Sequence, residues 1–175
     1  MDCCELRKAD AGMLAAIEIM RQEYIDAGSE IVGAGPLYRI ASIDEWWDFT
    51  KKLEDPSTVP ENWVVSEQFV YQRKSDGKIL GMIQFRHYFN SFLEIYGGHI
   101  GYSVRPSERR KGYATRMLAA CLLVCRDFGL ERVLITCDQN NEGSRRTILA
   151  NGGVYEKSVY KEPENVYLQR YWIEL

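Results

Sequence analysis

The sequence predicts an α/β (α+β) fold, in which a central, mixed and twisted sheet of about six to seven strands is flanked by about four helices. Two observations predict this class. Apolar residues follow strand-like and helix-like spacings in the order strand, two helices, three strands, helix, strand, helix, two strands. The 175 residues, of which 46% are hydrophobic, suffice for one core, so we expect a single domain spanning 1–175.

The first quarter of the chain predicts one strand and one helix. A short strand ends near Leu6-Arg7, and Asp10 is a candidate cap for the helix that follows. Apolar residues then recur at helical spacing, at Met13, Ile17, Met20 and Tyr24. Residues 27–42 contain three glycines and a proline, which is typical of an irregular loop.

A second helix and a β-hairpin come next. Ser42 and Glu45 resemble a capping box, and Pro56 ends the helix that they open. Of the Trp46-Trp47 pair in this helix, we expect one side chain in the core and the other at an interface. A homodimer is therefore one possible assembly. Two strands near 63–73 and 78–88 are joined by Ser-Asp-Gly, a hairpin turn signal.

The segment around 98–137 predicts a strand, a helix and a second strand. Ile100, Tyr102 and Val104 alternate as in a strand, while the glycines at 97, 98 and 101 indicate a bulge or a close backbone approach. An apolar helical stripe runs from Tyr113 to Phe128 and stops at Gly129; the run 132–137 is continuously apolar. A crossover of this kind predicts a parallel strand pair, with the residues before the helix at the ligand-binding edge. The helix 143–150 and strands at 154–160 and 166–173 complete the chain.

Composition and net charge argue against several classes of protein. The net charge of −3 argues against a nucleic-acid partner, and no apolar run approaches a membrane span or a signal peptide. Five cysteines without C-x-x-C spacing, together with only two histidines, argue against a disulfide framework and against a metal site. Reduced thiols of this kind predict a cytoplasmic protein.

The stretch Arg105–Leu118 stands out because it gathers five basic residues on an acidic background. A helix start offers unpaired N–H groups and the positive end of the helix dipole. Gly112 removes a side chain where the backbone must approach a ligand, and Arg109, Arg110 and Lys111 add positive charge. This combination predicts a pyrophosphate-type site, although the cations alone would also fit a solvated turn.

The string V-x-P-x-x-R-x-x-G-x-A, which runs from Val104 to Ala114, resembles the acetyl-CoA-binding motif of the GNAT N-acetyltransferases. Asn141, Ser144 and Gly152 are similar to the second family motif, N-x-x-S/A…G. The resemblance implies a single GNAT-like domain whose co-substrate is acetyl-CoA, with no metal. It also implies that the strand before the motif splays from the strand at 132–137 and pairs with the pantetheine arm. The cofactor-binding residues that it implies are Ser103, Val104, Arg109, Arg110, Lys111, Gly112, Tyr113, Ala114, Thr115, Asn141 and Ser144.

Acetyl transfer to an amine needs a neutral amine, a polarised thioester carbonyl and stabilisation of the leaving thiolate. A backbone N–H near Ser103–Val104 is expected to donate a hydrogen bond to the thioester carbonyl oxygen and so polarise it. Glu94 and His99 are the candidate bases, although each could be purely structural. Where many family members have a tyrosine acid, this chain has Ile148, so Tyr155 or Tyr160 would have to substitute. Cys137 fits an inert residue at a strand end better than a nucleophile.

Specificity is expected from the loop Gly28–Ser42 and the turn Tyr160–Asn165, since irregular segments usually carry it. Four residues there could attract a cationic amine: Glu30, Tyr38, Glu162 and Glu164. The acceptor is either a small-molecule amine or an amine of a protein or peptide. The main hypothesis is an N-acetyltransferase that works by direct transfer in a ternary complex. The alternative, which the missing tyrosine favours, is a non-catalytic acetyl-CoA-binding sensor or interaction module.

Overall fold

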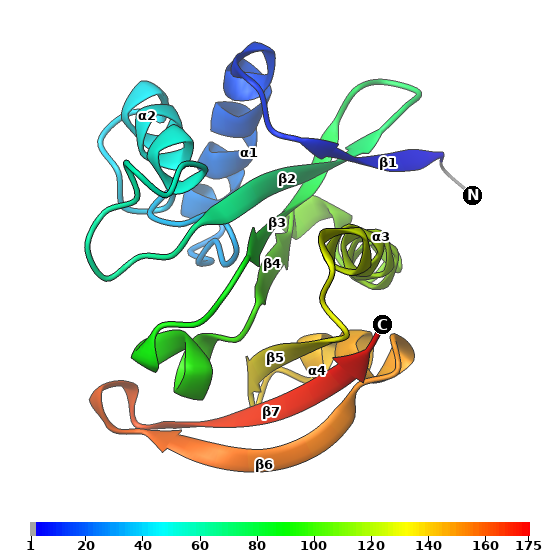
Figure 1. The fold of residues 1–175 in the computed structure, drawn as a ribbon. Helices are drawn as coiled ribbons and strands as arrows, with labels where there is room; N and C mark the ends of the chain where they lie inside the picture. Colours follow the sequence, from blue (N-terminus) through cyan, green and yellow to red (C-terminus); the bar gives the residue numbers. More distant parts are fainter. Residues whose placement is uncertain (1–2) are drawn as a thin grey trace.

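Two antiparallel sheets form the framework of the protein (Figure 1). The computed structural model describes residues 3–175. The first sheet has the order β1–β2–β3–β4, and the second has the order β5–β7–β6. Their bounds are β1 Cys4–Lys8, β2 Ser66–Arg73, β3 Ile79–Arg86, β4 Ile100–Val104, β5 Arg132–Asp138, β6 Val154–Lys161 and β7 Val166–Glu174. The seven strands and their order along the chain confirm the predicted fold class, although the strands form two antiparallel sheets and not one mixed sheet.

Four α-helices cover the sheets (Figure 1). α1 (Leu14–Asp26) and α2 (Ile43–Leu53) lie on one face of the first sheet, and α3 (Tyr113–Phe128) lies on the other. α4 (Glu142–Ala150) packs beside α3 and β5. Single turns occur at Ala11–Met13, Pro106–Glu108 and Glu162–Glu164, and a π-helical turn at Leu93–Gly97. Among the helices of residues 3–175, none combines the length and apolar character needed to cross a bilayer.

Local sequence signals explain where these helices begin and end. The Asp10 side chain accepts a hydrogen bond from the N–H of Gly12, and the Ser42 hydroxyl accepts one from Glu45, as the capping patterns predict. Gly129 ends α3 in the left-handed conformation, with φ of 103°. The second helix therefore starts where its capping box predicts, and α3 stops at its glycine.

The core lies on both faces of the first sheet, with β3 at its centre. Every residue from Ile79 to Phe85 is buried, because α1 and α2 cover one face of this strand and α3 covers the other. Trp46 is fully buried and donates its indole N–H to the carbonyl of Ala34 at 2.8 Å. Trp47 is half-buried and packs against the same cluster. The helix therefore turns Trp46 wholly into the core.

The predicted parallel pair of strands around the α3 crossover is wrong, because β4 and β5 belong to different sheets. The two segments meet just before β4, where the N–H of His99 donates to the carbonyl of Leu134 at 2.8 Å. Each strand uses its other edge for a full partner: β4 pairs with β3, and β5 pairs with β7. The two strands are thus pinned together before β4 begins and are not bonded as a ladder beyond it.

The glycines near this junction allow close backbone approach. At Gly98, with φ of 66°, an added Cβ would lie 2.4 Å from the carbonyl oxygen of Leu134. At Gly33, with φ of 78°, it would lie 2.0 Å from that of Gly101. The loop between α1 and α2 therefore rests directly on β4, and only glycine fits there.

Candidate functional site

A cleft of about 900 Å³ opens where β4 and β5 separate. Its walls come from β4, the start of α3, the end of β5, the first turns of α4 and the loop after α1. Ten of the predicted cofactor-binding residues line it: Ser103, Val104, Arg109, Arg110, Gly112, Tyr113, Ala114, Thr115, Asn141 and Ser144. Lys111, the eleventh predicted cofactor-binding residue, does not line the cleft. Residues from at least five elements of the chain thus converge on one site.

The start of α3 forms an open cradle of backbone amides. Gly112 precedes the helix in the left-handed conformation, with φ of 75°, and Arg110 is also left-handed, with φ of 62°. In the part of the chain that the structure describes, no side chain caps this helix start. Apart from chain neighbours, no heavy atom of residues 3–175 lies within 4 Å of a Cβ placed on Gly112. This geometry suits an anion that binds the first N–H groups of α3.

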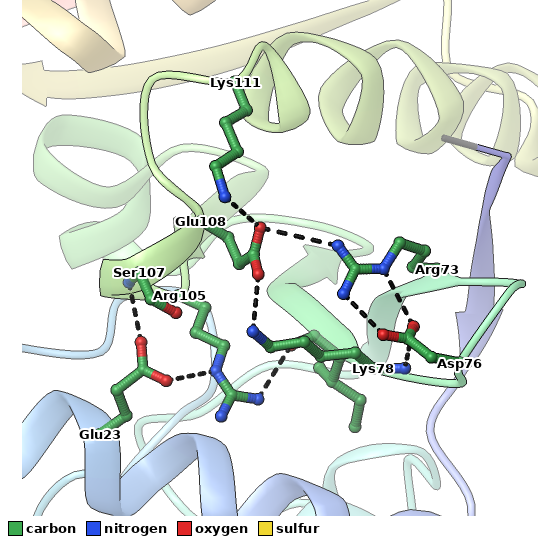
Figure 2. Close-up of polar contacts among 9 residues, drawn as sticks. Glu23, Arg73, Asp76, Lys78, Arg105, Ser107, Glu108 and Lys111 are labelled. Carbon is green, nitrogen blue, oxygen red and sulfur yellow. Dashed lines mark hydrogen bonds and ion pairs between the residues drawn. The ribbon is translucent and has the colours of Figure 1, made fainter. Parts of the chain in front are cut away.

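The basic side chains of the loop are held in different ways. Arg109 donates from Nε to the carbonyl of Val104 at 3.0 Å and from Nη2 to the Ser29 hydroxyl at 2.7 Å. Its guanidinium also lies over the Tyr24 ring, 5.6 Å from the centroid. Lys111 instead pairs with Glu108 at 2.8 Å (Figure 2). Contacts within the protein therefore hold Arg109 at the cleft, whereas Lys111 is directed toward Glu108.

A group of hydroxyl side chains lies where β4 faces α4. The Tyr102 hydroxyl is 2.9 Å from the Ser144 Oγ, and Asn141 caps α4 by accepting from the N–H of Ser144 at 3.0 Å. Burial raises the pKa of Tyr102 above its ordinary value, so the phenol keeps its proton at neutral pH. Burial also raises the pKa of Cys137 to about 11, which leaves an unreactive thiol. Sequence reasoning missed Tyr102, although it stands on the same strand face as Val104.

The predicted catalytic side chains Glu94 and Tyr155 lie outside the lining of the cleft as the structure describes it. Glu94 is exposed on the π-helical turn, and its carbonyl oxygen accepts from the Arg170 guanidinium. Tyr155 is 52% exposed on β6, with its hydroxyl 3.0 Å from that of Ser158. The second candidate acid, Tyr160, is also exposed and donates to Asn165.

His99 is buried at the junction of the two sheets, also outside the cleft lining as described for residues 3–175. Its Nδ1 accepts a hydrogen bond from the N–H of Leu134 at 2.9 Å, and its ring packs 4.1 Å from that of Phe89. Burial, helped by the charge of Arg86, lowers the pKa of His99 to about 4. The imidazole is therefore neutral, and its Nδ1 lone pair joins β4 to β5.

We expect His99 to make the protein less stable in mild acid. The unfolded chain binds a proton with a pKa near 6.5, but the folded chain binds it only near 4. Between these values the unfolded state binds more protons, so the free energy of unfolding falls by about 2–3 kcal/mol as the pH falls through this window. Urea unfolding from pH 4 to 7.5 measures this. A His99→Asn variant should lack this part of the slope, and identical slopes in the two proteins would contradict the prediction.

The loop after α1, the π-helical turn and strands β6 and β7 also contribute to the lining. Ser29, Glu30 and Val32 come from the loop, Tyr96 from the π-helical turn, Lys161 from the end of β6 and Leu168 from β7. The Glu30 carboxylate lies 3.5 Å from Arg39, and both side chains are largely exposed. Lys161 pairs with Glu164 at 2.7 Å. Of the four acceptor candidates, only Glu30 is part of the lining, while Tyr38, Glu162 and Glu164 are not.

Comparison with known proteins identifies a family model and solved structures that are similar to this chain. The family model described as "Acetyltransferase (GNAT) domain" matches residues 5–154. A search of curated proteins finds no significant match. Among solved structures, the ribosomal-protein-S5-alanine acetyltransferase of Vibrio fischeri is 18% identical, with a TM-score of 0.73 over 99% of this chain and 94% of that one. RimJ of Mycobacterium smegmatis, in complex with CoA-disulfide, is 20% identical, with a TM-score of 0.72 over 98% and 81%. A mutant spermidine N-acetyltransferase of Vibrio cholerae is 15% identical, with a TM-score of 0.68 over 97% and 94%.

Proposed function

Because the chain belongs to the GNAT acetyltransferase family, and is thus an N-acetyltransferase that uses acetyl-CoA, we propose that it acetylates a primary amine by direct transfer in a ternary complex. The acceptor is a small-molecule amine or an amine of a peptide or protein. The observation that carries this proposal is the cleft, which is lined both by the cradle before α3 and by loop residues such as Glu30. One continuous site can therefore hold a diphosphate-bearing donor beside an amine.

The residues of the cleft fit acetyl-CoA, which supplies an acetyl group activated as a thioester. The N–H groups at the start of α3 would hold its diphosphate, with Arg109 and Arg110 beside them. β4 pairs with β3 along one edge only, so no strand covers its opposite edge near Ser103–Val104, where the pantetheine arm would bind. On this edge the Val104 carbonyl accepts from Arg109. Asn141 would contact the cofactor from the α4 side.

Two side chains are proposed to handle protons and charge. As the amine nitrogen bonds to the acetyl carbon and the C–S bond breaks, Tyr102 would give its proton to the departing sulfur and the nitrogen would lose a proton to water. Tyr102 suits this role because it keeps its proton at neutral pH and Ser144 holds its hydroxyl at the cleft. The position of the usual family tyrosine, Ile148, is fully buried in the core and could not serve. Glu30 would contact the acceptor amine. Of the other lining carboxylates in the described chain, Glu108 is held by lysines and Asp138 accepts from the N–H of Asn140.

Initial rates of thiol release from acetyl-CoA, measured with a panel of peptides, amino acids and polyamines, test this proposal. We expect release with at least one amine class and intersecting double-reciprocal plots, because both substrates must be bound together. A Glu30→Gln variant should raise the KM for that acceptor about tenfold and leave the KM for acetyl-CoA unchanged. Parallel plots, or tight CoA binding without turnover on any amine, would contradict direct transfer.

Three further properties remain proposals. The chain would form one domain over 1–175. It would act in the cytoplasm, a compartment that its free, largely buried cysteines support. A homodimer would use the surface around the half-buried Trp47. Sedimentation velocity of the purified protein would measure its mass in solution, and a monomer at every concentration would contradict the dimer.

A further inference from the structure

We propose that Glu108 is a positioning residue for the CoA diphosphate: it ties the loop before α3 to the β2–β3 hairpin, so that the cradle exists before the cofactor binds. The inference rests on the proposed diphosphate assignment of this loop. Glu108 ends the short turn Pro106–Glu108, directly before the residues of the cradle. Its role would be indirect, through the backbone that it holds in place.

The Glu108 carboxylate lies among three cations (Figure 2). Its Oε1 is 2.6 Å from the Lys78 ammonium, and its Oε2 is 2.8 Å from that of Lys111. The Arg73 guanidinium lies 3.8 Å from the same Oε2 and also binds Asp76 through two hydrogen bonds, at 2.9 and 2.6 Å. Glu108 itself is only 4% exposed. This is a built and well-satisfied polar cluster rather than a solvated surface pair.

The cluster connects parts of the chain that are distant in sequence. Lys78 directly precedes β3, and Arg73 ends β2, so both belong to the hairpin that joins the two inner strands of the first sheet. Lys111 lies on the other side of Glu108, within the loop. The carboxylate thus bridges the hairpin and the loop, and Figure 2 shows it between the two lysines.

A second carboxylate anchors the same loop from the opposite direction (Figure 2). Glu23 of α1 accepts from the N–H of Ser107 at 2.8 Å and from Nε of Arg105 at 2.5 Å. The N–H of Arg105 in turn donates to the carbonyl of Leu80 at 2.8 Å. Residues 105–111 are therefore held from α1 and from the hairpin at once.

This anchoring explains why a carboxylate stands so close to a predicted anion site. A flexible loop would lose conformational freedom on binding CoA, whereas a loop ordered during folding binds without that cost. The neighbouring lysines lower the pKa of Glu108 to about 2, so the tie is intact throughout the neutral range. Its negative charge is also offset by the surrounding cations, so it repels a diphosphate little.

The test compares CoA with pantetheine, which lacks the diphosphate, in the Glu108→Gln variant. Glutamine can accept from only one lysine and turns an NH₂ group toward the other, so the loop loses its fixed position. We expect the Kd for CoA to rise about tenfold and that for pantetheine to stay unchanged, measured by calorimetry below the melting temperature. An unchanged or lower Kd for CoA would overturn the proposal. Equal weakening of both ligands would overturn it too, since that indicates general damage.

Two further variants sharpen the result. Glu67→Gln is the matched control, because Glu67 also has two basic partners, Lys8 at 2.9 Å and His87 at 3.2 Å, but lies on β2 outside the described cleft lining. It should leave CoA binding unchanged, and a loss equal to that of Glu108→Gln would refute a specific role.

Lys78→Met removes the link to the hairpin while Glu108 keeps its contact with Lys111, so it tests the proposal even where Glu108→Gln folds poorly. We expect it to weaken CoA binding to a similar extent, with no further loss in the double variant. Full additivity of the two losses, or normal CoA binding by Lys78→Met, would count against the tie. The diphosphate assignment is tested separately at Gly112, so either idea can fail alone.

Discussion

The Gly112→Glu variant is expected to lose CoA binding by at least a hundredfold while remaining folded. The new carboxylate would stand at the open start of α3, where the diphosphate is proposed to bind, and two anions placed side by side repel by several kcal/mol. The fold should tolerate the change, since an added Cβ meets nothing within 4 Å beyond its chain neighbours in residues 3–175. A carboxylate near a helix start also offsets part of the strain at a φ of 75°. Calorimetric titration with CoA, together with a thermal melt, measures both effects.

Gly112→Asn is the control for this experiment. Asparagine tolerates the left-handed conformation and is uncharged, so it introduces a polar side chain, one methylene shorter than that of glutamate, without the repulsion. We expect it to weaken CoA binding far less than glutamate does. Equal losses in the two variants would show that space rather than charge decides binding, and unchanged affinity of Gly112→Glu would exclude the diphosphate assignment.

The Tyr102→Phe variant is expected to lower kcat about a hundredfold with little change in the KM for acetyl-CoA. Phenylalanine keeps the ring in place but removes the hydroxyl that lies 2.9 Å from the Ser144 Oγ. Because burial raises the pKa of Tyr102, the wild-type rate should fall at high pH only above the ordinary tyrosine pKa. The variant should lack that alkaline fall. Steady-state rates with the acceptor found in the amine panel measure both quantities.

Tyr155→Phe is the matched control, since Tyr155 is exposed on β6 and lies outside the cleft lining of the described residues. It should leave kcat unchanged. Ser144→Ala should lower kcat less than Tyr102→Phe, because the phenol remains but loses its hydroxyl partner. A normal rate in Tyr102→Phe would exclude Tyr102 as the acid, and a loss of activity confined to Tyr155→Phe would assign that role to Tyr155, one of the two substitutes expected from the sequence.

Much of the fold follows from short-range patterns. The capping residues Asp10 and Ser42, the hairpin at residues 75–77 and the stop at Gly129 act through neighbours in the chain, so their structural effect can be read locally. The cradle before α3 belongs to the same class. Its glycine, its position after a strand and its helix start are contiguous, and the structure places them as the motif predicts.

The candidate catalytic residues depend on contacts that the chain makes over long distances. His99 and Glu94 have suitable chemistry for a base, but one is buried against Leu134 and the other lies exposed outside the described cleft lining. Periodicity reports which face of a strand a residue occupies, not which distant element covers that face. The role of His99 is therefore visible only once both sheets are in place.

From the order of residues alone one obtains the elements, the family motif and the loop proposed to bind the diphosphate, since each depends on propensity and spacing within a few turns. Tertiary packing sets the rest. Tyr102 meets Ser144 across 42 positions, and Glu108 meets Lys78 across 30. The cleft itself exists because β4 and β5 each bond to a different partner strand. Such pairings depend on which edges and faces remain free after the sheets assemble, and no local pattern carries that information.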